Sequence, residues 1–404
     1  MTPLQGLKVI DLSKVLAGPL CGQHLGELGA DVIKIEPPAA GDDTRSWLPQ
    51  EKGQSATFLS VNHNKRSLAV DLKTEAGRAI VHALVKDADI VLQGFGGGTA
   101  RKLAVDYETL SALNPQLIYL EISGYGRDGP LGAEPGYDVM LQAFSGMIST
   151  MGAPDGPFAR ASFSPVDLNT GTNAVAGVLA AVIERSRTGK GVYVEVSLLD
   201  TAMGLMTYLA QNYWRTGKLP QRMGTAHPAM APYQAFEAAD GPMMVGVGNE
   251  AQWKRFCAVA QLQDMRDDPR FATNADRVAH FDDTVARVAQ VMRTRTIAEW
   301  LPALRAAGVA CSPIHTLDQA LEHPQLQARQ LLVRTEHPVL GELHNVGLPI
   351  RFNGEARSAC RTPPLLGEHT REVMAQAGFS EDDIAQLTHT GVVAASAPPA
   401  VAAQ

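Results

Sequence analysis

The chain has 404 residues, of which 45% are hydrophobic and 6% aromatic, and its formal net charge at pH 7 is −7. A chain of this length holds roughly two to three domains of about 150 residues, and its apolar share suffices for ordinary hydrophobic cores. The negative charge excludes a nucleic-acid-binding protein whose whole surface is basic, while it leaves room for local basic pockets.

Residue spacings indicate neither a disulfide scaffold nor a metal site. The four cysteines are scattered without a CxxC pair, and they are Cys21, Cys257, Cys311 and Cys360. We expect reduced thiols, and the histidines show no metal-ligand spacing. The first residues do not resemble a signal peptide, and no stretch of about 18 uninterrupted apolar residues occurs. The sequence therefore favours a cytoplasmic enzyme without a membrane span.

Strand and helix patterns alternate over the first half of the chain. Apolar runs predict strands at 8–12, 30–36, 88–92, 117–122 and 192–196, and helical patterns occupy 18–28, 74–86, 107–114, 171–185 and 198–213. This order predicts an α/β fold with an open, mostly parallel, Rossmann-like sheet. Gly18, Gly22 and Gly26 recur on one face of the first helix, where the absence of side chains favours close packing on the sheet.

The pattern changes after about residue 215. A hairpin is predicted at 233–238 and 243–247, helices at 250–259, 282–292 and 297–306, and a strand at 309–314. Thr296 with Glu299 and Ser380 with Asp383 predict capped helix starts, and a further helix is predicted at 367–377. We therefore expect a large domain at 1–215 that resumes at 329–392, a smaller inserted α+β domain at 216–328, and a disordered Ala/Pro-rich tail at 393–404.

The opening strand–helix–strand unit is of the kind that binds dinucleotides, but its residues disfavour that function. Glu36 ends the second strand, where an NAD enzyme places its ribose-binding acid. The preceding turn lacks GxGxxG, however, and Pro19 removes one phosphate-binding N–H.

The segment 162–171 offers a candidate nucleophile, Asp167, near the expected start of a helix. Helix N–H groups and the helix dipole favour an ionised carboxylate there, and such a group can attack an activated acyl carbon. The alternative is that Asp167 only caps the helix, with Asn169 and Thr170 as rivals for that position.

Two further patterns are compatible with a bound phosphate ester. Basic residues gather in expected loops at 64–67, at Lys73, and at Arg101 and Lys102, where they could hold phosphates or remain solvated. A glycine-rich run at 94–98 follows a strand, and it could admit a ligand to the backbone or simply connect two elements.

Together these segments resemble the class III (CaiB/BaiF-type, formyl-CoA transferase-like) CoA-transferase family. The matching segments lie, in the family's order, at 4–19, 29–45, 64–67, 123–130, 135–138, around Asp167, at 187–191 and at 364–370, so that the resemblance covers about residues 4–392. It implies a Rossmann-like large domain built from both ends of the chain, a small inserted domain and an interlocked homodimer. It also implies acyl-CoA and a carboxylic acid as substrates, with no metal and no tightly bound cofactor.

The resemblance places Asp167 at the position of the family's nucleophilic aspartate. It implies that this carboxylate forms an aspartyl–acyl anhydride and then an aspartyl-CoA thioester. The CoA contacts that it implies are Leu16, Ala17, Val70, Asp71, Lys73, Gly94, Phe95, Gly96, Lys102, Gly136, Tyr137 and Asp138. Two positions depart from the family pattern: Pro37 replaces a common Arg, and the run 94–97 replaces Asn-Phe-Arg-Pro. Arg101 and Lys102 could compensate for the missing contacts.

Two alternatives and the substrate stay open. An α-methylacyl-CoA racemase of the same fold would carry His where this chain has Tyr137, and tyrosine, with an ordinary pKa near 10, is a poor base. A non-catalytic CoA-binding protein is the other alternative. Arg160, Arg222 or His227 could meet a second carboxylate, which would suit a dicarboxylate such as succinate, but each could equally be a surface residue.

Overall fold

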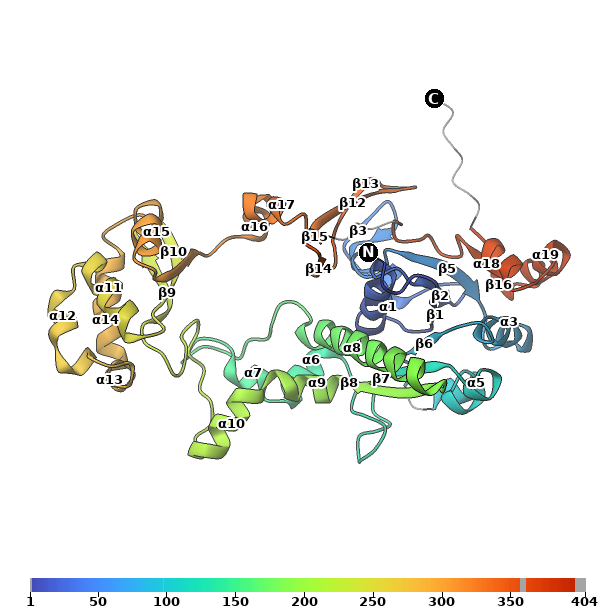
Figure 1. Cartoon of the computed structure of the whole chain (residues 1–404), viewed down its shortest axis with the longest axis horizontal. Helices are drawn as coiled ribbons and strands as arrows, with labels where there is room; N and C mark the ends of the chain where they lie inside the picture. The colour runs from blue at the N-terminus through green and yellow to red at the C-terminus, as the bar shows by residue number, and fades with distance from the viewer. Residues whose placement is uncertain (1, 97, 357–360, 397–404) are drawn as a thin grey trace, which may run out of the picture. The chain divides into compact units, whose positions relative to one another are not determined.

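The computed structural model describes residues 2–96, 98–356 and 361–396, which form two compact units. Unit 1 contains the chain up to Met147, Ala161–Gly217 and the residues from Pro324 onward, whereas unit 2 contains Ile148–Arg160 and Lys218–His323. The segment 148–160, which the sequence analysis assigned to the large domain, therefore belongs to the smaller unit. Figure 1 labels the elements of both units.

A seven-stranded sheet in the order β16-β5-β2-β1-β6-β7-β8 forms the centre of unit 1. Its strands are β1 (Lys8–Asp11), β2 (Asp31–Glu36), β5 (Lys65–Val70), β6 (Ile90–Gln93), β7 (Ile118–Ser123), β8 (Val192–Ser197) and β16 (Val393–Ala394). All neighbouring strands are parallel except β16, which runs antiparallel to β5. The open, mostly parallel sheet predicted from the sequence is confirmed.

Two of these strands were not predicted. β5 contains the basic residues expected in a loop, and β16 contains the first residues of the expected disordered tail. The prediction for the tail is therefore wrong at Val393–Ala394, where pairing with Val70 and Ala69 orders the backbone. Residues 397–404 lie outside the described residues, as do Gly97 and Cys360. The other three cysteines, Cys21, Cys257 and Cys311, are free thiols.

Helices cover both faces of the sheet, as the doubly wound prediction requires. α1 (Ala17–Glu27), α8 (Pro165–Thr188) and α9 (Leu198–Leu205) pack on one face, against Val9, Ile90 and Leu120 among others. α3 (Glu75–Val85), α5 (Tyr107–Leu113), α18 (Thr370–Gln376) and α19 (Glu381–His389) pack on the other. The predicted helix at 198–213 is two helices, because α9 ends before Met206 and α10 (Thr207–Thr216) follows it.

The glycines of α1 allow this helix to lie directly on the buried ends of the strands. A Cβ atom on Gly22 would lie 2.8 Å from Asp11 Oδ2, and one on Gly26 would lie 2.7 Å from the carbonyl oxygen of Asn64. The close approach predicted from the glycine spacing is confirmed.

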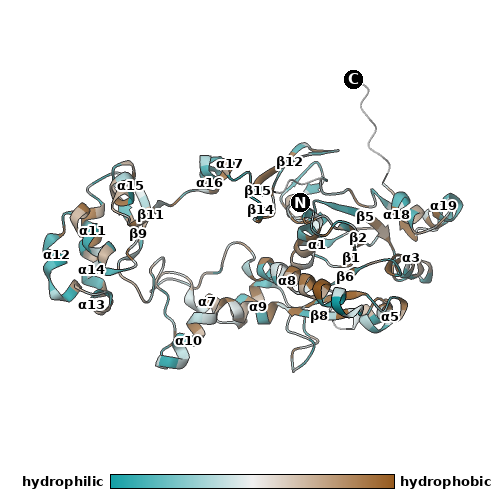
Figure 2. Ribbon diagram, in the orientation of Figure 1, coloured by the Kyte–Doolittle hydropathy of each residue, from teal (hydrophilic) through white to brown (hydrophobic). Residues whose placement is uncertain are grey.

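α8 begins at Pro165, earlier than the predicted start at 171, and runs for 24 residues. Among the described residues it is the one helix long and apolar enough to cross a membrane by length and composition. Figure 2 shows apolar residues along it, and Val166, Ala174, Val178 and Ala181 are buried in the core on the sheet. We therefore interpret α8 as a core helix.

Unit 2 contains a three-stranded antiparallel sheet in the order β11-β10-β9, with β9 (Tyr233–Ala238), β10 (Gly241–Gly246) and β11 (Ala310–Pro313). Its longer helices are α11 (Glu250–Ala260), α13 (Asn274–Ala279), α14 (Phe281–Met292) and α15 (Ile297–Ala306). Residues of α11, α14, α15 and the sheet form a core around Trp253, Phe256 and Trp300. The capping box of Thr296 and Glu299 is confirmed here, and that of Ser380 and Asp383 is confirmed in unit 1.

The remaining elements are short. They are η1 (Asp43–Ser46), β3 (Gln50–Glu51), β4 (Gln54–Ser55), α2 (Ala56–Ser60), α4 (Thr99–Lys102), α6 (Asp138–Phe144), α7 (Met147–Thr150), α12 (Gln263–Asp267), η2 (Pro269–Phe271), α16 (Leu317–Glu322), α17 (Pro324–Ala328), β12 (Leu332–His337), β13 (Gly341–Val346), β14 (Arg351–Phe352) and β15 (Glu355–Ala356).

Candidate active site

A pocket of about 270 Å³ opens in unit 1 where β1, β6 and β7 end and α8 begins. The β1–α1 turn (13–18) lines it, together with 94–96 after β6, 122–124 after β7, the segment 134–137 and Asp167. Crevices at the carboxyl ends of parallel strands are where open α/β sheets bind ligands. The pocket is therefore the first place in unit 1 to look for chemistry.

Asp167 lies in the first turn of α8, and 9% of its surface is exposed. It does not cap the helix, because Ser164 occupies the N-cap position. The two rivals are excluded as well: Asn169 Nδ2 donates to the carbonyl of Pro165 and Thr170 Oγ1 to that of Val166, so both lie inside the helix.

The electrostatic expectation for Asp167 is wrong. Burial and the nearby charge of Asp138 raise the pKa of Asp167 to about 7, whereas a helix N-terminus would favour the ionised form. Burial is the larger cause. In addition, Asp138 Oδ2 accepts hydrogen bonds from the backbone N–H of Val166, at 2.8 Å, and of Asp167, at 3.0 Å. The N–H groups expected to stabilise Asp167 are thus engaged by another carboxylate.

The implied CoA contacts divide into two groups. Residues that line the Asp167 pocket are Leu16, Ala17, Gly94, Phe95, Gly96, Gly136 and Tyr137. Outside its lining are Val70, Asp71, Lys73, Lys102 and Asp138. Asp71 accepts from the backbone N–H of Lys73 at 2.9 Å, and Lys73 and Lys102 are exposed. The carboxylate of Asp138 accepts hydrogen bonds from the backbone of α8.

The basic run 64–67 does not form a phosphate site. Lys65 is 1% exposed, and its ammonium donates to Asp11 Oδ2 at 2.9 Å, to the carbonyl of Pro19 at 2.8 Å and to Asn62 Oδ1 at 2.9 Å. Burial lowers the pKa of Lys65 to about 8 despite these acceptors. Arg66 pairs with Asp31 and Glu372. These cations pair with carboxylates within unit 1, so they are neither solvated nor available for a phosphate, and the prediction that they lie in a loop is wrong.

Glu36 is likewise engaged within the fold. It is 1% exposed and accepts from Arg45 Nε at 2.7 Å and from Ser67 Oγ at 2.7 Å. A carboxylate held in this way is not presented to a ribose. The exposed Pro37 follows it directly.

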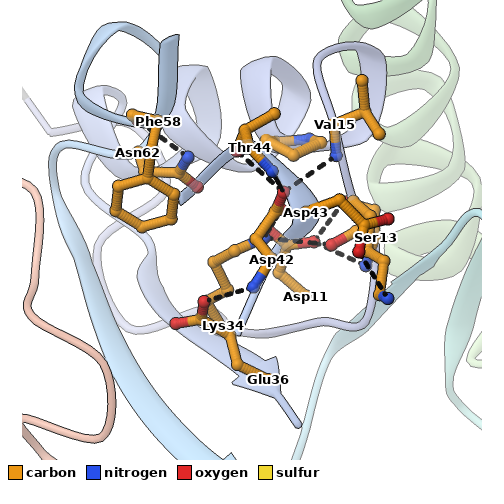
Figure 3. Close-up of polar contacts among 12 residues, drawn as sticks. Asp11, Ser13, Val15, Lys34, Glu36, Asp42, Asp43, Thr44, Phe58 and Asn62 are labelled. Atoms are coloured by element: carbon orange, nitrogen blue, oxygen red, sulfur yellow. Dashed lines mark hydrogen bonds and ion pairs between the residues drawn. The ribbon is translucent and has the colours of Figure 1, made fainter. Parts of the chain in front are cut away.

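A buried ion pair supports the turn that lines the pocket (Figure 3). Lys34 Nζ lies 2.9 Å from Asp42 Oδ2 and donates to the carbonyl of Ser13 at 3.0 Å, and neither charged side chain is exposed. Asp42 Oδ1 accepts from the N–H of Val15 at 3.3 Å, and Asp11 Oδ1 accepts from the N–H of Ser13 at 3.0 Å. Val15 adopts a φ of 71°, which is unfavourable for a β-branched residue, so these bonds fix a strained turn.

In addition to Asp167, the charged residues that line this pocket include two cations, Lys14 and Arg127. Lys14 Nζ lies 3.4 Å from Asp43 Oδ1, and both side chains are partly exposed. The residues proposed for a second carboxylate, Arg160, Arg222 and His227, all belong to unit 2. Arg222 there donates to the carbonyl of Pro154, and His227 Nδ1 accepts from the N–H of Ala229.

A second cavity of about 470 Å³ lies beside β7 and β8 in unit 1. Tyr107, Tyr119 and Tyr193 line it, and Tyr193 donates to Glu121, which also pairs with Arg127. Asp106, which accepts from Thr109 Oγ1 at 2.9 Å, is the other buried carboxylate in its lining. Both carboxylates are engaged within the fold, which makes the cavity a weaker candidate for acyl chemistry than the Asp167 pocket. Among residues 2–96, 98–356 and 361–396, no group of three or more His, Cys, Asp or Glu side chains could hold a metal ion.

The doubly wound sheet, with a buried carboxylate in the pocket at the carboxyl ends of its strands, is typical of an α/β enzyme. The family of this chain follows from comparison with known proteins. The chain belongs to CoA-transferase family III, whose sequence model matches residues 4–370. The chain is a CoA-transferase, which confirms the class of enzyme expected from the resemblance.

Several relatives span nearly the whole chain. A succinyl-CoA:glutarate CoA-transferase from Mus musculus is 36% identical over 97% of this chain and 91% of its own length. A succinate–glutarate CoA-transferase from Agrobacterium fabrum is 38% identical over 93% of this chain and 95% of its own length. The crystal structure of a CAIB/BAIF family protein from Brucella suis is similar with a TM-score of 0.82 and 37% identity, covering 93% of this chain and 99% of that one.

Proposed function

We propose that this transferase moves CoA from an acyl-CoA donor to a free carboxylic acid, with Asp167 as its nucleophile. The observation that carries the proposal is the position of Asp167, whose buried carboxylate lies in the pocket at the carboxyl edge of the sheet. A desolvated carboxylate with a raised pKa is more basic than an exposed one, and so it is a stronger nucleophile once ionised.

The reaction needs four acyl transfers. An Asp167 oxygen attacks the thioester carbonyl, the C–S bond breaks, and CoA leaves as a thiolate from the aspartyl–acyl anhydride. The thiolate attacks the aspartyl carbonyl and releases the first acid, which leaves an aspartyl-CoA thioester. The acceptor carboxylate then displaces CoA from Asp167, and the thiolate attacks the acceptor's acyl carbon to free Asp167. The thioester energy is conserved only if water is excluded, which a buried nucleophile favours.

We propose a dicarboxylate such as succinate or glutarate as one of the acids. The two relatives described above are named for succinate or succinyl-CoA and glutarate. In this chain, Lys14 lines the pocket that contains Asp167, and its ammonium would pair with a second carboxylate, whereas Arg127 already pairs with Glu121. The implied CoA contacts that line the pocket would hold the thioester end of CoA, and Lys73 and Lys102 its charged end.

We also propose an interlocked homodimer in the cytoplasm. α10 supports the assembly, since none of its residues is buried although it contains Tyr208, Tyr213 and Trp214, the last with 71% of its surface exposed. Exposed aromatic side chains are enriched at protein–protein interfaces, which supports an assembly that covers this helix.

Asp167→Ala tests the mechanism. We expect it to abolish CoA exchange between succinyl-CoA and glutarate, while size-exclusion chromatography and circular dichroism match the wild type. Asp106→Asn serves as control, because Asp106 caps α5 and does not line the Asp167 pocket. With ¹⁸O-labelled acceptor acid, mass spectrometry should find label in the Asp167 carboxylate of the wild-type enzyme. Exchange at near-normal rate in Asp167→Ala would reject Asp167 as the nucleophile.

A further inference from the structure

The start of α8 is unusual because a carboxylate from another helix takes its N–H donors. The first N–H groups of a helix have no partner within it, and together with the dipole they stabilise an anion in the first turn. Here Asp138 Oδ2 accepts from the N–H of Val166 at 2.8 Å and from that of Asp167 at 3.0 Å. The negative charge stabilised by this helix end is therefore that of Asp138.

Asp138 is itself held from two sides. It occupies the first position of α6 and is 7% exposed, and its Oδ1 accepts from the side-chain amide of Gln142 one turn later. Gln142 is completely buried, and its Oε1 accepts from the N–H of Ala161 at 3.1 Å. These bonds connect α6, the segment that leads into α8 and the first turn of α8. Asp138 does not line the pocket, so it is not placed to touch the substrate.

We infer that Asp138 is a positioning residue for the transfer reaction: it fixes the first turn of α8 so that Asp167 faces the pocket, and it denies Asp167 the helix N–H groups that would weaken it as a nucleophile. The inference rests on the proposed role of Asp167 and assigns Asp138 a different task from the CoA contact implied by the resemblance.

The charge of Asp138 acts on the reaction because Asp167 alternates between an anion and a neutral acyl group. Repulsion between the two carboxylates disfavours the anion, and acylation of Asp167 relieves it. The raised pKa of Asp167, due to burial and then to Asp138, agrees with this arrangement. The other titratable or charged groups in the pocket are Lys14, Asp43, Arg127, Glu134 and Tyr137.

Asp138→Asn removes the charge and keeps the hydrogen bonds to α8, because an asparagine amide oxygen still accepts from the two backbone N–H groups. Its NH2 group replaces the oxygen that accepts from Gln142, so that bond is lost together with the charge. We expect the acid limb of the kcat–pH profile to move to lower pH by about one unit, since the like charge is gone. We also expect kcat on the plateau to fall about tenfold or more, with the KM for acyl-CoA within about twofold of wild type, because the substrate does not touch this side chain. Asp106→Asn, which removes a capping charge outside the pocket, should leave the profile unchanged.

Gln142→Met provides a second variant that keeps the charge and releases the carboxylate. We expect kcat to fall while the acid limb stays in place. An Asp138→Asn enzyme with a wild-type pH profile and kcat, or one that changes only the KM for acyl-CoA, would overturn the inference, as would wild-type kcat in Gln142→Met. These outcomes differ from those that reject the proposed function, which fails if Asp167→Ala retains exchange.

Discussion

Replacing Asp42 by alanine should lower the unfolding free energy of unit 1 by about 3–5 kcal/mol, the usual cost of leaving one charge of a buried pair uncompensated. Neither Lys34 nor Asp42 exposes its side chain, and their charged atoms lie 2.9 Å apart. Without Asp42, the ammonium of Lys34 keeps the carbonyl of Ser13, at 3.0 Å, but loses its nearest carboxylate. The N–H of Val15 loses its acceptor as well.

A double variant identifies the source of this loss. Because an apolar pair of similar volume avoids the desolvation cost, Lys34→Met with Asp42→Leu should be less destabilised than Asp42→Ala alone. Urea unfolding followed by circular dichroism gives the free energies, and hydrogen exchange read by mass spectrometry restricts the effect to peptides of unit 1. The reasoning would be refuted by an Asp42→Ala protein within about 1 kcal/mol of wild type, or by a double variant less stable than the single one.

The same pair predicts a pH dependence. Burial opposes ionisation of Asp42, but the Lys34 charge and hydrogen bonds from Lys34 and Thr44 outweigh it and lower the pKa of Asp42 from 3.8 to about 2. The unfolded chain therefore binds the proton first, and ionised Asp42 contributes about 2 kcal/mol of stability above about pH 4. This contribution is lost as the pH falls from about 4 to about 2. The stability difference between wild type and Asp42→Asn should shrink over that interval, and a constant difference would contradict the assignment.

Three further outcomes are expected. Gly22→Ala should lower the melting temperature, since its Cβ would lie 2.8 Å from Asp11 Oδ2, whereas Gly204→Ala in α9, with nothing within 4 Å of the added atom, should not. Lys14→Met should raise the KM for dicarboxylate acceptors more than that for monocarboxylates, and equal changes would exclude Lys14 as the cation that binds the second carboxylate. The kcat of the wild-type enzyme should fall as the pH drops through about 7, because protonated Asp167 is not a nucleophile, and a profile flat to pH 5 would contradict the raised pKa.

The sheet could be predicted from the sequence where its strands are apolar runs, as in β1, β6 and β7. β5 was not predicted because it contains Lys65 and Arg66 and is therefore not an apolar run. In the fold, the charges of these two residues are compensated by Asp11 and Asp31. These partners lie 54 and 35 residues earlier in the chain, so no local pattern indicates that the two cations are in a strand.

The candidate site was predictable in part. Asp167 could be proposed as a candidate from the sequence, since an acid near a helix start is visible there and the family resemblance points to it. The hydrogen bonds of Asp138 to α8 could not be predicted, because which carboxylate receives the α8 N–H groups depends on how α6 packs against α8. One local signal was available: the spacing of Asp138 and Gln142 places the two side chains on one face of a helix.

The antiparallel pairing of β16 with β5 has a consequence for synthesis on the ribosome. β5 ends at Val70, and its last partner on that side, β16, begins at Val393. At a synthesis rate of about 5–20 residues per second, roughly 15–65 s separate the emergence of the two strands from the ribosome. During this interval, one side of β5 has unpaired backbone N–H and C=O groups that other nascent chains could bind.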